Sequence, residues 1–394
     1  MIQQQYSRRG FLRSASLGTA ALTLGLPKEL LALGEPSRAP RLHPGGEILL
    51  NSNENAYGPM PSVAPAMAKA LEFANRYPDR QIDNLTERIA AYHSVSADRV
   101  MLGCGSTEIL RMAVYGFLQK PGAKLVTASP TFEVVEAFAR IMGAPVATVP
   151  LTSDYGHDLD AMRAAVGSAG LVYICNPNNP TASLTPRRQI EDFITALPPD
   201  VTVLIDEAYH HFAVGAEGYT SFLEKPVHDP RVVVARTFSK IYGMAGIRLG
   251  YAVAEPEAIN AIARYQLPDH INMVATLSGA TALDDDTGMK AAIARNARDR
   301  DDFMHQAAAR GVKPIPSYCN FLMMPAGRPA EEVIAHFKRN GILIGRRFPA
   351  LENSVRVSLG TPAQMQAFWR VWDTLPATHA GTSGPATHAG TSGS

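Results

Sequence analysis

The chain has 394 residues and lacks the marks of several large classes of protein. Its three cysteines are odd in number and far apart, so they form neither a disulfide framework nor a metal-binding spacing. The eleven histidines show no H-E-x-x-H or comparable pattern, and no metal site is predicted. Charged residues make up 19% of the chain and the net charge is +1, which excludes the basic surface that binding to nucleic acid requires.

A long unbroken hydrophobic run is also missing. Residues 14–33 are modestly apolar but are interrupted by glycine, proline and charged residues, so no stable membrane anchor is predicted. Before them, Ser7-Arg8-Arg9-Gly10-Phe11-Leu12-Arg13 closely matches the twin-arginine export motif, and Ala32-Leu33-Gly34 offers a signal-peptidase site. Residues 1–34 are therefore predicted to be a twin-arginine signal peptide, and the mature protein is predicted to be periplasmic or otherwise exported. A chance Arg-Arg pair before an amphipathic start is the alternative.

The carboxyl terminus repeats itself, because residues 376–384 recur as residues 385–393 before Ser394. The repeat is small, polar and rich in turn-forming residues, with too little apolar surface to fold. Residues 376–394 are therefore predicted to be a disordered tail.

Between these ends, the length predicts two or three domains and a substantial core. Residues 100–260 alternate apolar, strand-like runs with helical segments, which is the pattern of a mostly parallel sheet. We expect an α/β fold with an amino-terminal arm over residues 35–60, a large domain over residues 61–268 and a smaller α/β domain over residues 269–375.

One lysine lies in a distinctive setting, the segment Arg236-Thr237-Phe238-Ser239-Lys240, and Arg248 follows it closely. A lysine that forms a Schiff base must be accessible, held still and near a group that lowers its proton affinity. Thr237, Ser239 and Arg248 carry hydrogen-bond donors of the kind that bind phosphate. A reactive lysine beside a phosphate site is what pyridoxal phosphate requires. Taken alone, Lys240 is more simply interpreted as a solvated surface charge.

A second motif ends at Asp206. The run from Val201 to Ile205 is apolar without alternation, which is typical of a strand buried on both faces. Asp206 comes where the run ends, at the carboxyl edge where open α/β sheets place their ligands. A carboxylate there could keep a pyridine nitrogen protonated, and Tyr209 could donate to the phenolic oxygen of the same ring. The alternative is that Asp206 only caps a following helix.

A third motif follows the strand-like run from Val172 to Cys175, which enters the turn Asn176-Pro177-Asn178-Asn179-Pro180. Asn179 precedes a proline and so favours extended backbone, which directs its amide toward a ligand. A plain Asn-Pro turn is the alternative.

Taken in order, the motifs that carry Asn179, Asp206 and Lys240 resemble those of the fold-type I pyridoxal-phosphate aminotransferases, and within them the histidinol-phosphate aminotransferase family. The resemblance extends from Leu50 to about Thr361. It implies a large domain with a mostly parallel seven-stranded sheet, pyridoxal 5'-phosphate as cofactor, and Lys240, Asp206 and Tyr209 as catalytic residues. It also implies that Asn179 and Tyr209 hold the oxygen of the cofactor ring.

The resemblance assigns two further groups of cofactor-binding residues. Gly105, Ser106 and Thr107 follow a short apolar strand and open a helical stretch, where backbone amides and the helix dipole favour a phosphate. Together with them, the residues implied to bind the cofactor phosphate are Thr237, Ser239 and Arg248. Phe132 stands where the family has an aromatic residue that stacks on the cofactor ring, and Ala182 stands where the family usually has glycine.

Tyr77, in Arg76-Tyr77-Pro78, matches the tyrosine that reaches the cofactor phosphate of a neighbouring subunit. This implies a homodimer with a shared active site. Arg356 matches the arginine that binds the substrate anion, which is a carboxylate or a phosphate. Arg346 is the expected second cation for the substrate, whereas Arg347 has the character of a surface charge.

The expected activity is transfer of an amino group between a small-molecule amino donor and a 2-oxo acid. Histidinol phosphate is the family's own substrate, but export favours an aromatic or other amino acid, because histidine synthesis is a cytoplasmic pathway. A decarboxylase of phosphothreonine type shares the same lysine site and stays open as an alternative reaction. A catalytically inactive binding protein is the alternative from a different class.

Overall fold

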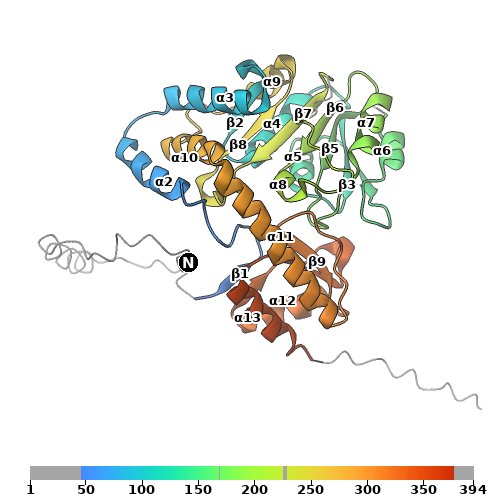
Figure 1. Ribbon diagram of the computed structural model, residues 1–394. Helices are drawn as coiled ribbons and strands as arrows, with labels where there is room; N and C mark the ends of the chain where they lie inside the picture. The colour runs from blue at the N-terminus through green and yellow to red at the C-terminus, as the bar shows by residue number, and fades with distance from the viewer. Residues whose placement is uncertain (1–45, 168, 225–228, 377–394) are drawn as a thin grey trace, which may run out of the picture. The chain divides into compact units, whose positions relative to one another are not determined.

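The computed structural model describes residues 46–167, 169–224 and 229–376 (Figure 1). The predicted signal peptide and the predicted tail beyond Pro376 lie outside these residues. Within them, no helix is both long enough and apolar enough to cross a membrane.

A seven-stranded sheet forms the centre of the large domain, with the strand order β2-β8-β7-β6-β5-β3-β4. Strand β8 runs antiparallel to both its neighbours, and every other adjacent pair is parallel. The strands are β2 (Val100–Gly103), β3 (Lys124–Ser129), β4 (Val146–Pro150), β5 (Ala169–Cys175), β6 (Thr202–Asp206), β7 (Val232–Thr237) and β8 (Gly250–Val253). The predicted mostly parallel seven-stranded sheet is confirmed.

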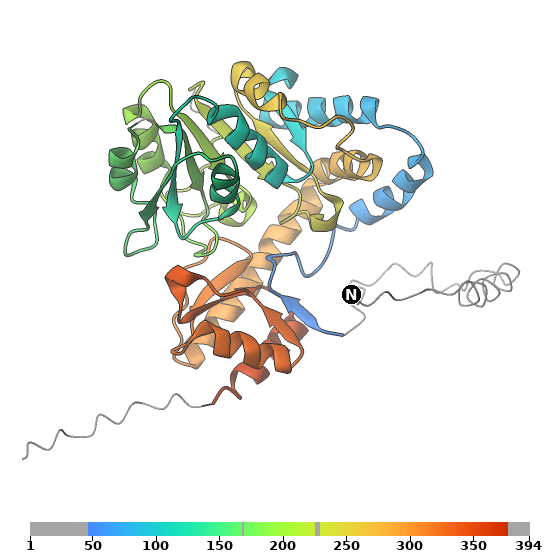
Figure 2. The ribbon, with the colours of Figure 1, turned by 180° about the vertical axis from the view of Figure 1, so that it is seen from behind.

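The central strands are buried on both faces, as their continuous apolar runs predict. In β5, Val172 and Ile174 pack into one hydrophobic cluster, whereas Tyr173 and Cys175 pack into the cluster on the opposite face. Helices cover both faces of the sheet (Figures 1 and 2). The first cluster includes side chains of α3 (Asp79–His93), α6 (Leu159–Ala165), α7 (Arg187–Ala196), α8 (His210–Ala213) and α10 (Met273–Asp284), and the second those of α4 (Ser106–Phe117), α5 (Val134–Ile141) and α9 (Pro256–Ala263).

The small domain has its own hydrophobic cluster, in which the rings of Phe303, Phe337, Phe368 and Trp369 pack together. It contains the antiparallel strands β9 (Phe321–Pro325) and β11 (Ser354–Ser358), the strand β10 (Ile342–Ile344), and the helices α12 (Ala330–Arg339) and α13 (Pro362–Trp372). The long helix α11 (Asp286–Ala309) contributes Ala292 to the large-domain core and Phe303 to this cluster, so it links the two (Figure 1).

The division into a large and a small domain, with its boundary near Pro268, stays a prediction; the two names are used for the seven-stranded sheet with its helices and for the elements packed around β9 and β11. Helix α10, which follows that residue, packs against α3 and α2 (Val63–Ala70) in the large domain. Four short 3-10 helices complete the described elements: η2 (Leu71–Phe73), η3 (Ala97–Arg99), η4 (Ala245–Ile247) and η5 (Pro349–Leu351).

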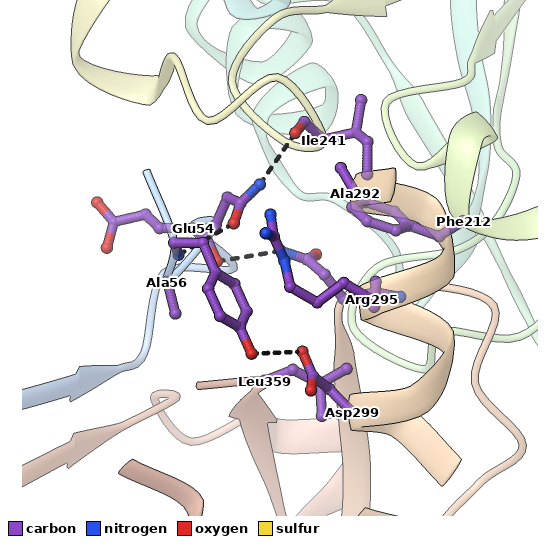
Figure 3. Close-up of a pocket in the computed structure, with 12 residues that line it drawn as sticks. Glu54, Ala56, Phe212, Ile241, Ala292, Arg295, Asp299 and Leu359 are labelled. Carbon is purple, nitrogen blue, oxygen red and sulfur yellow. Dashed lines mark hydrogen bonds between the residues drawn. The ribbon is translucent and has the colours of Figure 1, made fainter. Parts of the chain in front are cut away.

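The amino-terminal arm connects the two domains. Its strand β1 (Ile48–Leu50) pairs in parallel with β10 of the small domain. Farther along the arm, the Asn55 amide donates to the carbonyl of Ile241 (2.9 Å), one residue after Lys240 (Figure 3). Gly243, with φ +69°, lies against Gly58 of the arm, and a Cβ on Gly243 would overlap the Gly58 carbonyl. The arm therefore lies directly on the loop that carries Lys240.

This contact predicts that Gly243→Ala destabilises the protein strongly. The alanine would have to keep a left-handed backbone, at a cost of roughly 1–2 kcal/mol, and would also displace the arm. We expect a total loss of about 2–4 kcal/mol in the free energy of unfolding, measured by urea denaturation. Gly246→Ala is the matched control, because a Cβ on Gly246 meets no atom within 4 Å. Equal losses from the two substitutions would contradict this account of the contact.

Candidate active site

Lys240 follows the carboxyl end of β7 and lies under the amino-terminal arm. Its ammonium donates to the backbone carbonyls of Asn53 (3.2 Å) and Ser52 (3.4 Å). Burial and the nearby guanidinium of Arg356 lower the pKa of Lys240 to about 8, from its usual 10.5. Arg356 is a group of the kind expected near this lysine, because its positive charge disfavours the charged form of the amine.

Asp206 ends β6 on the same edge of the sheet, and its side chain is buried. Burial raises the pKa of Asp206 to about 6, although a hydrogen bond that the Tyr173 hydroxyl donates to Asp206 Oδ2 (2.9 Å) opposes the rise. Its other oxygen, Oδ1, accepts from the backbone N–H of Ala208 (3.1 Å). Asp206 is not the N-cap of the following helix, because α8 begins at His210 and its N-cap is Tyr209.

Tyr209 lies beside Lys240, whose ammonium is 5.7 Å from the centre of the tyrosine ring. The Tyr209 hydroxyl accepts a hydrogen bond from Asn53 Nδ2 (2.9 Å). Burial raises the pKa of Tyr209, so its hydroxyl keeps its proton at neutral pH and can act as a donor.

Asn179 and Arg356 are joined across the two domains. Arg356 Nη1 donates to Asn179 Oδ1 (2.7 Å), and Arg356 Nη2 donates to the carbonyl of Asn51 (2.8 Å). Because the oxygen of the Asn179 amide is bound to Arg356, its nitrogen is left as a donor for a ligand. The guanidinium of Arg356 also lies near the rings of Phe321 (5.5 Å) and Phe348 (5.2 Å), and its Nε is buried without a hydrogen-bond partner among the described residues.

Arg346 lies close to Arg356, since both guanidiniums contact the ring of Phe348. Arg346 is nevertheless paired with a carboxylate, because its Nη2 is 2.5 Å from Glu133 Oε2. Arg347, in contrast, binds Glu331 (2.7 Å) and Glu352 (2.5 Å) outside this set.

The predicted phosphate-binding residues converge at the amino terminus of α4. Gly105, with φ +77°, is the N-cap, and a Cβ there would overlap the guanidinium of Arg248. Arg248 Nη1 also donates to Ser239 Oγ (3.3 Å), and the Ser239 N–H donates to Thr237 Oγ1 (3.1 Å). These contacts bring the helix terminus, two hydroxyls and a guanidinium into one small region.

This region fits a phosphate monoester. The first N–H groups of α4, at Ser106 and Thr107, have no partner within the helix and point from its positive end. Across the described ranges, Arg248 forms no ion pair with a carboxylate and instead donates to carbonyl and hydroxyl oxygens. A Cβ on Gly250 would overlap the Ser106 N–H, so glycine is required at two points of the cradle. The donors are therefore of the right chemistry for the phosphate of pyridoxal phosphate.

Two predicted residues lie apart from these direct contacts. Phe132 packs against the hydrophobic cluster that includes Tyr173, on the sheet face where Tyr173 binds Asp206. Tyr77 is 74% exposed, and within the described part of the chain it makes no hydrogen bond or ring contact with the other predicted site residues.

Sequence reasoning missed several residues that hold the site together. Asn53, Ser358 and Asn320 meet around the arm, Tyr173 supports Asp206, and Glu133 neutralises Arg346. Tyr173 had a detectable signal, because a hydroxyl in a strand that is apolar on both faces requires a buried partner. The others pair residues far apart in the chain, for which the local sequence gives no indication.

Comparisons with known proteins agree with this geometry. The sequence matches the family described as Aminotransferase class I and II over residues 46–371. The histidinol-phosphate aminotransferase of Moorella thermoacetica is 34% identical over 326 residues, which make up 82% of this chain and 84% of that protein. The aromatic amino acid aminotransferase of Rhodococcus jostii is 36% identical over 339 residues, which make up 84% and 91% of the two chains.

The fold also has solved counterparts. The crystal structure of histidinol-phosphate aminotransferase from Sinorhizobium meliloti in complex with pyridoxal-5'-phosphate superimposes with a TM-score of 0.77 at 29% identity. The superposition covers 84% of this chain and 92% of that one.

The lowered pKa of Lys240 predicts that the amine destabilises the cofactor-free protein. With a folded pKa of about 8 against 10.5, the charged form is disfavoured in the folded state. The resulting loss in the free energy of unfolding is therefore fully present below pH 8, and it disappears as the pH rises through 10.5. Lys240→Met should raise the free energy of unfolding by about 1–2 kcal/mol at pH 7, measured by urea denaturation, and this gain should shrink at pH 10. The exposed Lys290→Met serves as control; a gain for Lys240→Met that did not change with pH would contradict the prediction.

Proposed function

The chain belongs to the class I and II aminotransferase family and uses pyridoxal 5'-phosphate, and on that premise we propose that it transaminates amino acids with aromatic or other apolar side chains. The observation that carries this choice is the charge of the substrate end of the site. Among the described residues, no carboxylate forms an ion pair with Arg356, whereas Glu133 already neutralises the second cation, Arg346.

The cofactor, when bound, supplies an aldehyde that bonds to a primary amine and a pyridine ring that takes up electrons. Asp206 lies where it would hold the pyridine nitrogen, and the donors around Arg248 and the first turn of α4 would hold the phosphate. Lys240 Nζ takes the proton from the substrate's α-carbon, for which a pKa of about 8 suits a general base near neutral pH. The free amide nitrogen of Asn179 and the Tyr209 hydroxyl are donors for the ring oxygen.

One unpaired guanidinium matches one carboxylate. The remaining N–H groups of Arg356 lie on a partly buried side chain, so Arg356 can bind the α-carboxylate of an amino acid in two-pronged fashion. A phosphate monoester carries close to two negative charges at neutral pH, and the second would face the Glu133 carboxylate across Arg346. This arrangement favours a monoanionic substrate over a phosphorylated amine such as histidinol phosphate.

The walls of the same region are apolar. Phe321 and Phe348 flank Arg356, and Phe348 packs with Ile315 and Met323 in a separate hydrophobic cluster. Aromatic rings around a carboxylate-binding arginine suit an amino acid with an aromatic side chain. Sequence identity does not separate the alternatives, because relatives named for histidinol phosphate and for aromatic amino acids are about equally similar.

The substrate proposal predicts the outcome of a spectroscopic titration. The visible cofactor band should bleach with phenylalanine or tyrosine and return with a 2-oxo acid, without release of carbon dioxide. We expect kcat/KM for phenylalanine to exceed that for histidinol phosphate by at least about 10-fold, which corresponds to roughly 1.4 kcal/mol. Higher kcat/KM for histidinol phosphate would contradict the proposed substrate, and stoichiometric carbon dioxide would indicate the decarboxylase.

Glu133→Gln tests the charge argument directly. Removing this carboxylate frees Arg346, so kcat/KM for histidinol phosphate should rise about 3- to 10-fold while that for phenylalanine changes little; the pair is half-exposed, which limits the effect. Glu136→Gln is the matched control, because Glu136 pairs with Arg140 within α5, the helix that follows Glu133. An unchanged preference in Glu133→Gln would show that the neutralised cation does not set the substrate.

The proposal extends to assembly and location. Tyr77 is exposed in the single chain and matches a tyrosine that reaches a neighbour's cofactor, which supports a homodimer with a shared site. Mixing inactive Lys240→Met and Tyr77→Ala subunits should restore activity through one intact composite site. A monomer in sedimentation would contradict the homodimer.

The twin-arginine motif supports export of the folded enzyme. Replacing Arg8 and Arg9 by lysine should retain the protein in the cytoplasm. Export without the two arginines would contradict this point.

A further inference from the structure

We propose that Asn53 is a positioning residue that sets the direction in which the Tyr209 hydroxyl donates its proton. The inference rests on the proposed function, because the acceptor of that proton is the phenolic oxygen of the cofactor ring. Asn53 belongs to the arm, and it is the point at which the arm, both domains and Lys240 meet.

Five hydrogen bonds converge on Asn53, which is 1% exposed. Its backbone N–H donates to Ser358 Oγ (2.8 Å), and its carbonyl accepts from Lys240 Nζ (3.2 Å) and Asn320 Nδ2 (3.1 Å). Its side chain donates through Nδ2 to the Tyr209 hydroxyl (2.9 Å) and accepts through Oδ1 from Ser358 Oγ (3.4 Å).

Ser358 fixes which end of the Asn53 amide faces Tyr209. The serine oxygen already accepts from the Asn53 N–H, so its single proton is available for the amide oxygen of the same residue. With Oδ1 on the serine side, the amide nitrogen faces the tyrosine. The Tyr209 oxygen therefore accepts from Asn53, and its own proton must go to a different acceptor.

No second hydrogen bond of the Tyr209 hydroxyl occurs within the described ranges, and Tyr209 is 3% exposed. Leaving a buried hydroxyl proton without an acceptor raises the free energy of the protein. A ligand that places a hydrogen-bond acceptor beside the Tyr209 hydroxyl, on the side away from Asn53, is therefore favoured. The phenolic oxygen of pyridoxal phosphate is such an acceptor. Without the Asn53 donor, the phenol could turn its proton toward the arm instead.

The backbone explains why asparagine suits this position. Asn53 has φ +54°, a left-handed conformation that glycine, asparagine and aspartate adopt most readily. Of these three, glycine has no side chain, and an aspartate carboxylate would accept from Tyr209 rather than donate to it. Ser358 lies two residues after Arg356 on β11, so both side chains point to the same face of that strand. The strand that binds the substrate thus also holds the amide that orients Tyr209.

The test is a pH titration of the visible cofactor band in the holoenzyme without substrate. A donor on the phenolic oxygen stabilises its negative charge, so the ring system loses its proton at lower pH. Asn53→Gly keeps the left-handed backbone and removes the donor, and it should raise the midpoint by about 0.5–1 pH unit, the worth of one hydrogen bond. Tyr209→Phe should raise it by at least as much, and adding Asn53→Gly to Tyr209→Phe should produce no further shift.

Two further variants separate positioning from general damage to the arm. Asn55→Gly removes an amide that anchors the same arm to Ile241 and should leave the midpoint in place. Ser358→Ala leaves Asn53 unchanged and should give part of the Asn53→Gly shift. The proposal is overturned if Asn53→Gly leaves the midpoint unchanged while Tyr209→Phe moves it, if Asn55→Gly moves it equally, or if the Asn53 and Tyr209 shifts add. If the holoenzyme shows no cofactor band, or if Tyr209→Phe does not shift the midpoint, the proposed binding of the cofactor at this site is wrong. The proposed function and this inference would then both fail.

Discussion

Two cations in one partly buried site, Lys240 and Arg356, impose the constraint on which the rest of this structure depends. Burial lowers the pKa of both groups, and for Lys240 the nearby Arg356 guanidinium lowers it further. For Lys240 the result is an amine that exists partly uncharged near neutral pH, as a nucleophile and proton acceptor must be. For Arg356, which keeps its charge, the result is a strong demand for an anion, and the substrate carboxylate meets that demand.

The arm and the sheet edge together provide the acceptors that these cations need without adding a carboxylate at close range. Carbonyls of Ser52 and Asn53 bind Lys240, and Asn51 and Asn179 bind Arg356. Neutral acceptors leave the positive charge available to a ligand, whereas in an ion pair such as Glu133–Arg346 the carboxylate neutralises it. The glycine contact between Gly58 and Gly243 brings the arm close enough for these carbonyls to serve. Placement of the arm is therefore part of the chemistry of the site.

The sequence predicted the fold and the cofactor site largely because both follow from local pattern. Buried parallel strands are continuous apolar runs, and the polar residues that end them, such as Asp206, must lie at the ligand-binding edge. The same reasoning could not find Asn53 beside Tyr209 or Arg346 beside Glu133, which are separated by 156 and 213 residues. Ala182 shows a smaller limit: it occupies a left-handed conformation, φ +60°, where the family usually has glycine, and its cost is set by packing that no local pattern reveals.

The central claim, that Lys240 is the residue that carries the cofactor, is tested most directly by peptide mapping after borohydride reduction of the holoenzyme. Reduction makes the link between lysine and cofactor permanent, and trypsin does not cut after a modified lysine. The account predicts an uncut peptide from Thr237 to Arg248 that carries the mass of the cofactor on Lys240. Cofactor mass on another lysine, with normal cleavage after Lys240, would contradict it.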